Sequence, residues 1–299
     1  MPKLRVTVLM GGRGSERDIS LISGREVVKN LDRKKYEVEE LVLNDDLGLL
    51  LKIKTDVVFI AIHGKDGEDG LIQGMLDFLK IPYTGSGLLA SAVGMNKIIF
   101  KRAIAHLKVA MPEWRVYKNG LEVNFPCVVK PADQGSSVGV SVVKEMANFS
   151  KAVELAGKYS GEIIVEEYIE GTEVSCGVLG NDDLMVLPVI EIRPKNAFFD
   201  YEAKYTEGKC EEIVPARLDK EMTKKVQNLA VTVYEEIGCR GFGRVDMIIK
   251  KGIVYVLEIN TIPGLTPQSL LPKEAKAAGM SYSGLLDRII ELALEYHSV

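Results

Sequence analysis

Four polar side chains in residues 241–260 have the types and the spacing of a metal and phosphate site. Arg244 and Asp246 lie in one apolar segment, and Glu258 and Asn260 lie in the next. Alternation at period two places each pair on a single face of its strand. Carboxylate and amide oxygens suit Mg²⁺, and a guanidinium beside them can hold a phosphate or an oxyanion. The segment therefore predicts a magnesium site, with a solvated sheet face and a cross-strand ion pair as the alternative.

The pairing of these two strands is predicted from the turn between them. A three-residue loop over 251–253, with Gly252 in it, sets Asp246 opposite Glu258 and gathers the apolar side chains on the other face. A two-residue loop would set Asp246 opposite Leu257 and mix charge into the core. The apolar face is then expected to hold Val245, Met247, Ile249, Tyr255, Leu257 and Ile259.

Residues 130–139 form a second candidate, a loop rich in glycine and serine that begins at Lys130. Glycines permit close approach of the backbone, and the amides and hydroxyls can donate to phosphate oxygens. The loop lacks the ending of a P-loop and does not open a helix, so it is not that motif. At the end of a later strand, backbone groups near Ile169 could read an adenine edge, and Glu173 could hold ribose hydroxyls. A flexible hairpin and a charged strand end are the respective alternatives.

Several loops follow predicted strands at the edge where open sheets bind ligands. Residues 11–17 look like a dinucleotide fingerprint but fail it, because Arg17 replaces the third glycine. Glu16 there either balances a helix dipole or binds a substrate ammonium. His63 is either a ligand or a structural histidine, and Glu68 with Asp66 is expected to cap the next helix.

Two further loops could act during catalysis. The polar segment 200–205 could be a lid. The Pro-Gly turn after Asn260 can present the Gly264 amide to a developing oxyanion.

Strands and helices alternate around these residues, which predicts three α/β units with ligand sites in the clefts between them. The first unit reads as a small doubly wound domain, and a helix capped by Asn96 leads out of it. The predicted strands are 4–10, 36–43, 56–62, a short one near 82–85, 125–131, 138–143, 162–168, 174–179, 185–192, 211–214 and the two of the hairpin; the predicted helices are 17–31, one after 70, 96–106, 146–159, 219–237 and 282–296.

Composition is that of an ordinary globular protein, with 299 residues, 46% hydrophobic and 27% charged. A net charge of −4 argues against a nucleic-acid surface, and no apolar run reaches membrane-spanning length. Three histidines form no zinc cluster, and four separated cysteines read as free thiols in a reducing cytoplasm. We therefore expect a cytoplasmic protein without nucleic-acid or membrane partners.

Eight motifs lie in a fixed order along nearly the whole chain. They are Gly-Ser-Glu16-Arg-Asp-Ile-Ser, Ala-Ile-His63-Gly-Lys-Asp-Gly-Glu-Asp-Gly, Pro-Tyr-Thr-Gly-Ser-Gly, Met-Asn-Lys97, Gly-Ser136-Ser-Val-Gly, Asp-Tyr-Glu-Ala-Lys204-Tyr205, Gly-Arg244-Val-Asp246 and Glu258-Ile-Asn260-Thr-Ile-Pro-Gly264. Together they resemble the D-alanine–D-alanine ligases of the ATP-grasp superfamily. At Asp133-Gln134 and at Ile262 the sequence differs from the residues most common in this family.

The resemblance implies an α/β fold in which an N-terminal doubly wound parallel-sheet domain precedes an ATP-grasp fold of two α+β subdomains. The implied bounds are 1–95 for substrate binding, 96–172 for the central subdomain and 173–299 for the subdomain with the metal site. It also implies ATP-dependent ligation of two D-alanines through an acyl phosphate for peptidoglycan synthesis. The expected partners are ATP, D-alanine and a second copy of the chain, and the expected cofactor is a pair of Mg²⁺ ions, with Mn²⁺ as a substitute.

The family roles carry over to individual residues of this chain. Nucleotide would contact Lys97, Lys130, Ser136, Ser137, Glu166, Ile169, Glu173 and Lys204; the metals would bind Asp246, Glu258 and Asn260; the amino acids would contact Glu16, His63, Lys204, Arg244, Ser269 and Leu270; and Glu16, Ser136, Tyr205, Arg244, Gly264 and Ser269 would act in catalysis. Ser136 and Tyr205 would form a latch with Glu16, and Arg244 with the Gly264 amide would stabilise the oxyanion.

Two alternatives remain beside this function. One is another ATP-grasp ligase that joins a carboxylate to an amine, or a D-alanine–D-lactate ligase. Tyr205 argues against the lactate variant, because such enzymes change this lid position. The other is a nucleotide-binding protein without catalysis, which the full metal set and Arg244 disfavour.

Overall fold

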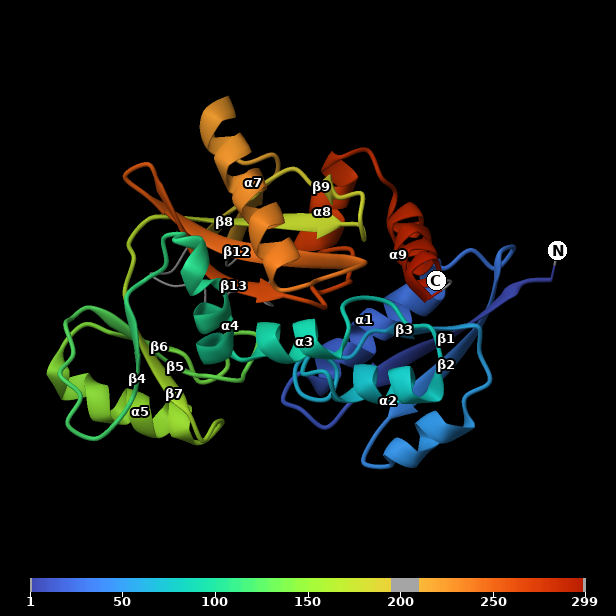
Figure 1. The fold of residues 1–299 in the computed structure, drawn as a ribbon, viewed down its shortest axis with the longest axis horizontal. Coiled ribbons are helices and arrows are strands. Elements are labelled where there is room, and N and C mark those ends of the chain that lie inside the picture. Colours follow the sequence, from blue (N-terminus) through green and yellow to red (C-terminus); the bar gives the residue numbers. More distant parts are fainter. Residues whose placement is uncertain (1, 195–209, 298–299) are drawn as a thin grey trace.

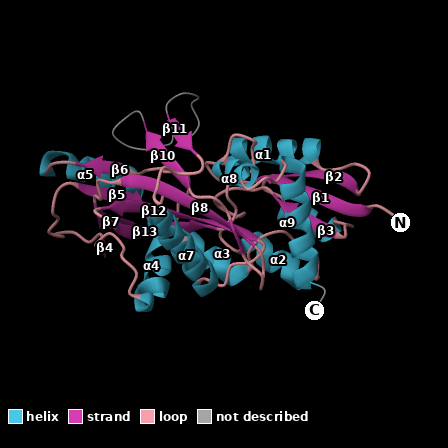
Figure 2. Ribbon diagram, turned by 90° about the horizontal axis from the view of Figure 1, so that it is seen from above, coloured by secondary structure: helices cyan, strands magenta, loops and turns pink. Residues whose placement is uncertain are grey.

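The computed structural model describes residues 2–194 and 210–297. Its N-terminal part is a three-stranded parallel sheet in the order β2-β1-β3, formed by β1 (Leu4–Gly11), β2 (Tyr36–Leu43) and β3 (Val57–Ile60). Helix α1 (Arg17–Asn30) lies on one side of this sheet and α2 (Leu71–Leu79) on the other (Figure 2). Runs of buried aliphatic residues make β1 and β3, as expected for strands covered on both faces, whereas β2 at the edge of the sheet is mostly half-buried or exposed.

Helix α9 (Tyr282–His297) completes this first core, although it lies far away in the sequence (Figure 1). Its buried face, which includes Leu285, Leu286 and Ile289, belongs to the same hydrophobic cluster as Val8 and Phe59 of the parallel sheet. The helix packs against α1 and β3. A short 3₁₀ segment, η1 (Leu47–Lys52), also contributes to this cluster through Leu50.

Two consecutive helices lead from the first sheet to the rest of the molecule (Figure 1). Asn96 caps the second of them, because its Oδ1 accepts from Ile98 N at 3.0 Å and Ile99 N at 3.1 Å. The central unit then has a four-stranded antiparallel sheet in the order β4-β7-β5-β6 with one helix against it. The elements are α3 (Leu88–Met95), α4 (Lys97–Ile104), η2 (Ala105–Leu107), β4 (Trp114–Val116), β5 (Cys127–Pro131), β6 (Ser141–Val143), η3 (Met146–Asn148), α5 (Phe149–Gly157) and β7 (Ile163–Glu167).

The third unit is a six-stranded sheet with strands in the order β11-β10-β8-β12-β13, and β9 pairs with β8 beside this path. One face packs against α7 and α4 in an apolar cluster that includes Val174, Val245 and Val233. Helix α8 packs against β8. The elements are β8 (Thr172–Leu179), β9 (Met185–Val186), β10 (Ile190–Pro194), β11 (Cys210–Ile213), α7 (Lys220–Glu236), β12 (Phe242–Lys250), β13 (Ile253–Asn260) and α8 (Leu270–Ala277).

The predicted pairing of Asp246 with Glu258 is confirmed, but the predicted loop is wrong. The turn has two residues, Lys251 and Gly252, both with positive φ (49° and 77°), as in a type I′ hairpin. A register shift after Asp246 inserts Leu257 as an extra residue on β13 and restores the pairing.

Because of this bulge, the apolar face predicted for the second strand of the hairpin is wrong at Tyr255 and Leu257. Val254 and Val256 are buried in the core with Ile259, whereas Tyr255 and Leu257 are only half buried. Leu257 lines a cavity instead.

The predicted α/β fold class is confirmed. The short fourth strand near residue 83 is reduced to an isolated parallel bridge between Val58 and Tyr83. The helices α3 and α8 and the strand β4 were not predicted, and the strand expected over 185–192 is split into β9 and β10.

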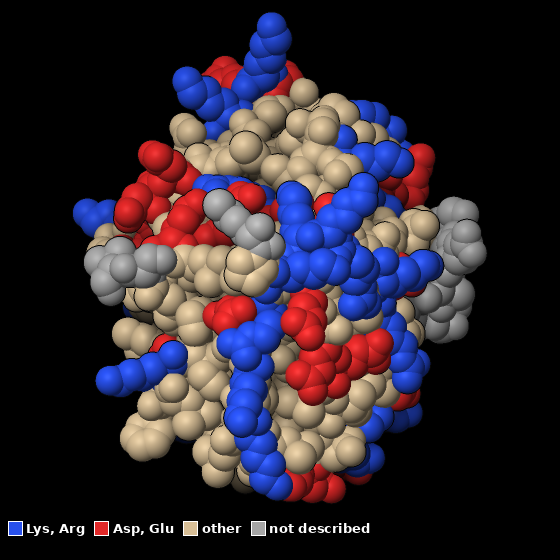
Figure 3. Space-filling view, turned by 90° about the vertical axis from the view of Figure 1, so that its right-hand side faces the viewer, with Lys and Arg blue, Asp and Glu red and all other residues tan. Residues whose placement is uncertain are grey.

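The outer face of the N-terminal end carries mixed charge (Figure 3). Lysine and arginine side chains form a band across it, and acidic side chains border that band. In the described residues, no helix is both long and apolar enough to cross a bilayer.

Candidate active site

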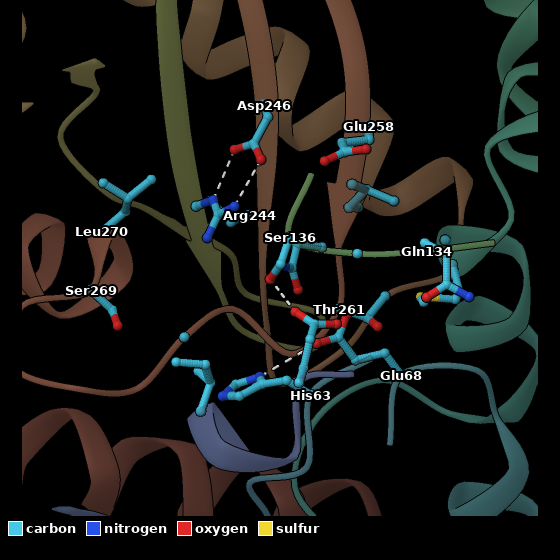
Figure 4. A pocket seen from close by; sticks show the side chains of 18 of the residues that line it. His63, Glu68, Gln134, Ser136, Arg244, Asp246, Glu258, Thr261, Ser269 and Leu270 are labelled. Atoms are coloured by element: carbon cyan, nitrogen blue, oxygen red, sulfur yellow. Dashed lines mark hydrogen bonds and ion pairs between the residues drawn. The ribbon is translucent and has the colours of Figure 1, made fainter. Parts of the chain in front are cut away.

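Two cavities meet between the three units. The first, about 320 Å³, is lined by Glu16 and His63 from the N-terminal unit, Ser136 from the central unit, and Arg244 and Ser269 from the third unit (Figure 4). The second, about 200 Å³, lies against the central sheet. The two linings share six residues, and these mark the junction: Lys97, Gln134, Glu173, Ile192, Asp246 and Glu258.

The hairpin places its polar residues at this junction. Asp246 and Glu258 are cross-strand partners, and Arg244 is paired with Asn260. Asp246 accepts from Arg244 Nε at 2.8 Å and Nη2 at 2.7 Å, and from Ser175 Oγ at 2.5 Å. The Asn260 Oδ1 accepts from the backbone N–H of Ile262 at 3.0 Å. The sequence-predicted set is therefore brought together, and Ser175 is a contact that the sequence alone did not indicate.

Glu274 of α8 is a second residue that sequence reasoning missed. It is fully buried, and its Oε1 accepts from Gly177 N at 3.1 Å. Gly177 is the cross-strand partner of Arg244, so this carboxyl lies beside the guanidinium's strand. Burial raises the pKa of Glu274 well above the usual glutamate value, although Arg244 and the Gly177 N–H oppose the shift. The hydrogen bond from Gly177 N–H to Glu274 fastens α8 to β8.

Glu274→Gln should keep the fold and should gain stability over the wild type as pH rises above 4.5, the ordinary glutamate pKa. Because the pKa is higher in the folded state, protonation of Glu274 stabilises the fold fully below the ordinary glutamate pKa, and this stabilisation is lost as pH rises. Glutamine keeps the side-chain oxygen that accepts from Gly177 N–H but does not titrate. Relative to Glu274→Gln, Glu274→Ala should cost about 1–3 kcal/mol at every pH, because the Gly177 N–H loses its partner and neither variant titrates at this position. Melting temperatures of the three proteins across pH check this, and parallel pH profiles for wild type and Glu274→Gln would contradict it.

The glycine–serine loop meets the N-terminal unit at Glu16. Ser136 Oγ donates to Glu16 Oε1, which is the part of the predicted latch that the described residues contain. A side chain at Gly135 would come within 2.8 Å of Glu16 Oε2, so any larger residue there would displace the Glu16 carboxylate. Ser136 and Ser137 both have positive φ (49° and 58°), and they face different cavities, the first and the second respectively.

His63 is buried at the floor of the first cavity (Figure 4). Its Nδ1 lies 3.1 Å from Ile262 O and 3.4 Å from Glu68 Oε1, and its Nε2 lies 2.9 Å from Ser23 Oγ. Burial lowers the pKa of His63, but Glu68 and then Glu16 outweigh it and the net shift is upward. His63 thus ties the N-terminal unit to the loop that precedes Gly264.

The expectation that Asp66 and Glu68 cap α2 is wrong. Asp66 pairs with Arg13 Nη2 at 2.7 Å, and Glu68 faces His63. Asp69 accepts from Leu71 N at 3.1 Å instead. The two acids near a helix start looked like caps because the sequence does not show that Arg13 and His63 lie beside them.

Two buried lysines, Lys97 and Lys130, line the second cavity. Lys97 Nζ lies 3.3 Å from Glu258 Oε2 and donates to Gln134 O at 2.6 Å. Lys130 Nζ lies 2.7 Å from Glu166 Oε2. Burial opposes both charges of this second pair. The attraction of Glu166 nevertheless raises the pKa of Lys130, and the attraction of Lys101 and then of Lys130 lowers the pKa of Glu166. Both ion pairs therefore line the second cavity.

The other predicted site residues fall into three groups. Ile169, Glu173 and Ser137 line the second cavity. Asn260, Gly264, Ser269 and Leu270 line the first, and a side chain at Gly264 would come within 2.8 Å of Ser269 Oγ. The predictions for Lys204 and Tyr205 lie outside the described residues.

Residues 5–52 and 47–86 match the family D-ala D-ala ligase N-terminus, and residues 89–291 match the family D-ala D-ala ligase C-terminus. The chain belongs to the D-alanine–D-alanine ligase family. Over 302 residues it is 43% identical to the D-alanine–D-alanine ligase of Desulforudis audaxviator, covering 97% of this chain and 99% of that relative. The family resemblance and the expected enzyme class are thereby confirmed.

Solved structures agree with this membership. The D-alanine–D-alanine ligase of Bacillus anthracis complexed with ATP has a TM-score of 0.87 and 37% identity, with 99% of each chain covered. The VanG D-Ala:D-Ser ligase of Enterococcus faecalis has a TM-score of 0.85 and 32% identity, with 98% of this chain and 100% of that chain covered. The fold of this family therefore spans ligases with different second substrates.

Proposed function

We propose that the protein joins two D-alanines into D-alanyl-D-alanine and converts ATP to ADP and phosphate, as a step of peptidoglycan precursor synthesis in the cytoplasm. The observation that carries this proposal is the junction of the two cavities at Asp246 and Glu258. ATP bound in the second cavity would present its γ-phosphate there. A D-alanine carboxylate in the first cavity would reach the same point.

Each cavity has the groups that its substrate needs. Lys97 and Lys130 hold the phosphates, while Glu166, Ile169 and Glu173 hold adenosine. Glu16 binds the ammonium of the first D-alanine, and His63 lies near its carboxylate. Ser269 and Leu270 receive the second D-alanine at the N-terminus of α8. The roles of Ser136, Ser137, Lys204 and Tyr205 remain those that the family resemblance implies.

The donor set at the junction fits Mg²⁺. Two carboxylates and one amide, Asp246, Glu258 and Asn260, offer hard oxygen ligands from paired strands. In the described residues, no group of three His, Cys, Asp or Glu side chains could hold a metal ion, so the proposed site takes the Asn260 amide as its third ligand. Bound Mg²⁺, or Mn²⁺ in its place, would neutralise phosphate charge.

The chemistry then proceeds in two steps. A carboxylate is a poor acylating agent, so one of its oxygens first attacks the γ-phosphorus of ATP. The bond between that phosphorus and the oxygen bridging to the β-phosphate breaks, which gives an acyl phosphate and ADP. The amine of the second D-alanine attacks the acyl carbon, loses a proton, and phosphate leaves. Arg244 and the Gly264 amide stabilise the oxyanion of this step. The contact between Ser136 and Glu16 closes the first cavity against water, which would hydrolyse the acyl phosphate.

The deciding assay measures phosphate release from ATP with D-alanine, L-alanine, D-serine and D-lactate, with products identified by mass spectrometry. We expect release and dipeptide with D-alanine alone. ATP binding without release stimulated by D-alanine would indicate a nucleotide-binding protein. Preferential formation of mixed products with D-serine or D-lactate would indicate a ligase of altered specificity.

We further propose that two copies of the chain associate through an apolar patch on the N-terminal unit. The patch lines a groove beside α2 and contains Phe78 (86% exposed), Leu51 (66%), Leu88 (48%) and Leu71 (42%). An exposed apolar surface of this kind marks an interaction site. Phe78→Glu should convert a dimer into a monomer in sedimentation velocity, and exposed Met185→Glu on β9 is the matched control. A wild type that sediments as a monomer would refute the proposal.

A further inference from the structure

Lys101 is a buried lysine that none of the proposed roles uses. It follows Lys97 by four residues on α4, so the two side chains leave the same face of the helix. Lys101 is 0% exposed, while its neighbour Arg102 is exposed. Burying an ammonium is costly unless it is paired. A lysine side chain normally extends its ammonium to water, so the burial of Lys101 calls for a partner.

The partner of Lys101 is Glu166, which also pairs with Lys130. Lys101 Nζ lies 3.1 Å from Glu166 Oε1, and Lys130 Nζ lies 2.7 Å from Oε2. Each carboxylate oxygen thus faces a different ammonium. In the described part of the chain, Lys130 and Glu166 line the second cavity and Lys101 does not. The cluster has two positive charges for one negative charge, so one lysine can leave without stranding the carboxylate.

We infer that Lys101 is a positioning residue for ATP: it holds the Glu166 carboxylate when Lys130 turns from Glu166 to the nucleotide phosphates. This inference rests on the proposed function, in which Lys130 binds phosphate. Without Lys101, Lys130 would be the remaining counter-ion of a carboxylate that is 3% exposed. Moving Lys130 to phosphate would then leave a buried charge unpaired, which is strongly unfavourable. Lys101 removes that penalty without touching the nucleotide.

Lys101→Met tests this with two ligands, because adenosine lacks the phosphates for which Lys130 must move. Calorimetric titration should show ATP affinity reduced at least about tenfold relative to wild type, and adenosine affinity unchanged within about threefold. With adenosine, Lys130 stays on Glu166, so this proposed adenosine contact remains paired and in place without Lys101. The quantity to compare is therefore the ratio of the ATP affinity to the adenosine affinity. An equal loss for both ligands would mean that Lys101 only shapes the cavity wall, and no loss for either would mean that it has no role; both results overturn the inference.

Two controls accompany this variant. Arg102→Met removes a positive charge from the next position of the same helix and should leave the ratio unchanged. Lys130→Met should lower the ratio by itself. If Lys130→Met lowers the ratio and Lys101→Met does not, the inference alone fails. If Lys130→Met leaves the ratio unchanged, the proposed phosphate role of Lys130 fails, and the inference fails with it.

A double variant keeps the test decisive even if Lys101→Met unfolds. In a Glu166→Gln background the competing charge is gone, so Lys130 is available to phosphate whether or not Lys101 is present. Adding Lys101→Met to Glu166→Gln should therefore change the ratio by less than about threefold. A tenfold fall in that background would show that Lys101 acts on ATP by another route.

Discussion

Glu258→Gln should lose at least about a hundredfold in turnover while the protein stays folded. Glu258 lies opposite Asp246 at the junction of the two cavities, where the phosphoryl group is expected to move. An amide has the shape of the carboxylate but lacks the charge that holds a divalent cation. The substitution should cost little stability, because the Glu258 side chain is 29% exposed and Lys97 keeps its hydrogen bond to Gln134 O. Kinetics at increasing Mg²⁺ should show partial recovery.

Glu212→Gln is the matched control for this variant. Glu212 lines the same cavity and is also paired with a lysine, Lys273, but it stands outside the proposed metal set. Near-normal turnover of Glu258→Gln at ordinary Mg²⁺ would remove Glu258 from the metal site. Asp246→Asn should behave like Glu258→Gln in turnover but be less stable, because Asp246 accepts two hydrogen bonds from buried Arg244.

The second large effect is expected for Arg244→Met, which should still bind ATP but should form dipeptide roughly 10²–10³ times more slowly. The guanidinium lines the first cavity and is held by two hydrogen bonds to Asp246. Its position is therefore fixed before the oxyanion forms, which is the condition under which such a donor contributes most. Single-turnover rates and ATP titrations measure the two quantities separately.

Loss of stability must be separated from this loss of rate. Removing Arg244 leaves Asp246 buried without its cation, which we expect to cost about 3–5 kcal/mol of unfolding free energy. Arg217→Met breaks a similar forked pair, with Glu191 at 2.7 Å, and serves as the control outside both cavities. Equal loss of ATP affinity and turnover in Arg244→Met would make Arg244 a phosphate ligand instead.

The hairpin shows what sequence patterns can predict. Asp246 and Glu258 were placed together because charge and apolar residues had to separate between the two faces. That requirement holds in the fold, but the chain meets it with a type I′ turn and a bulge at Leu257. The pattern constrains which residues share a face. It does not distinguish a two-residue turn with a bulge from a three-residue loop, because both satisfy that constraint. The predicted core therefore failed at Tyr255 and Leu257.

The buried polar residues show what patterns cannot predict. Lys101 and Glu274 lie on short helices, and each meets its partner across a long interval of sequence, at Glu166 and at Gly177. Their partners sit on strands of different sheets, so neither spacing nor periodicity brings the pairs together on paper. Lys101 gave one usable signal, its four-residue spacing from Lys97. The helix carrying Glu274 was missed because Pro272 falls within its first turn, where proline is tolerated but reads as a helix breaker.

The position of α9 has a consequence for how the polypeptide emerges during translation. The parallel sheet is made first, yet its hydrophobic cluster includes Leu285, Leu286 and Ile289 from a helix that is synthesised after all the other described elements. The nascent N-terminal unit must therefore wait on the ribosome with an uncovered apolar face while the two later units are produced. Such a face is a target for chaperones, and the opening unit of the chain is the one that finishes folding late.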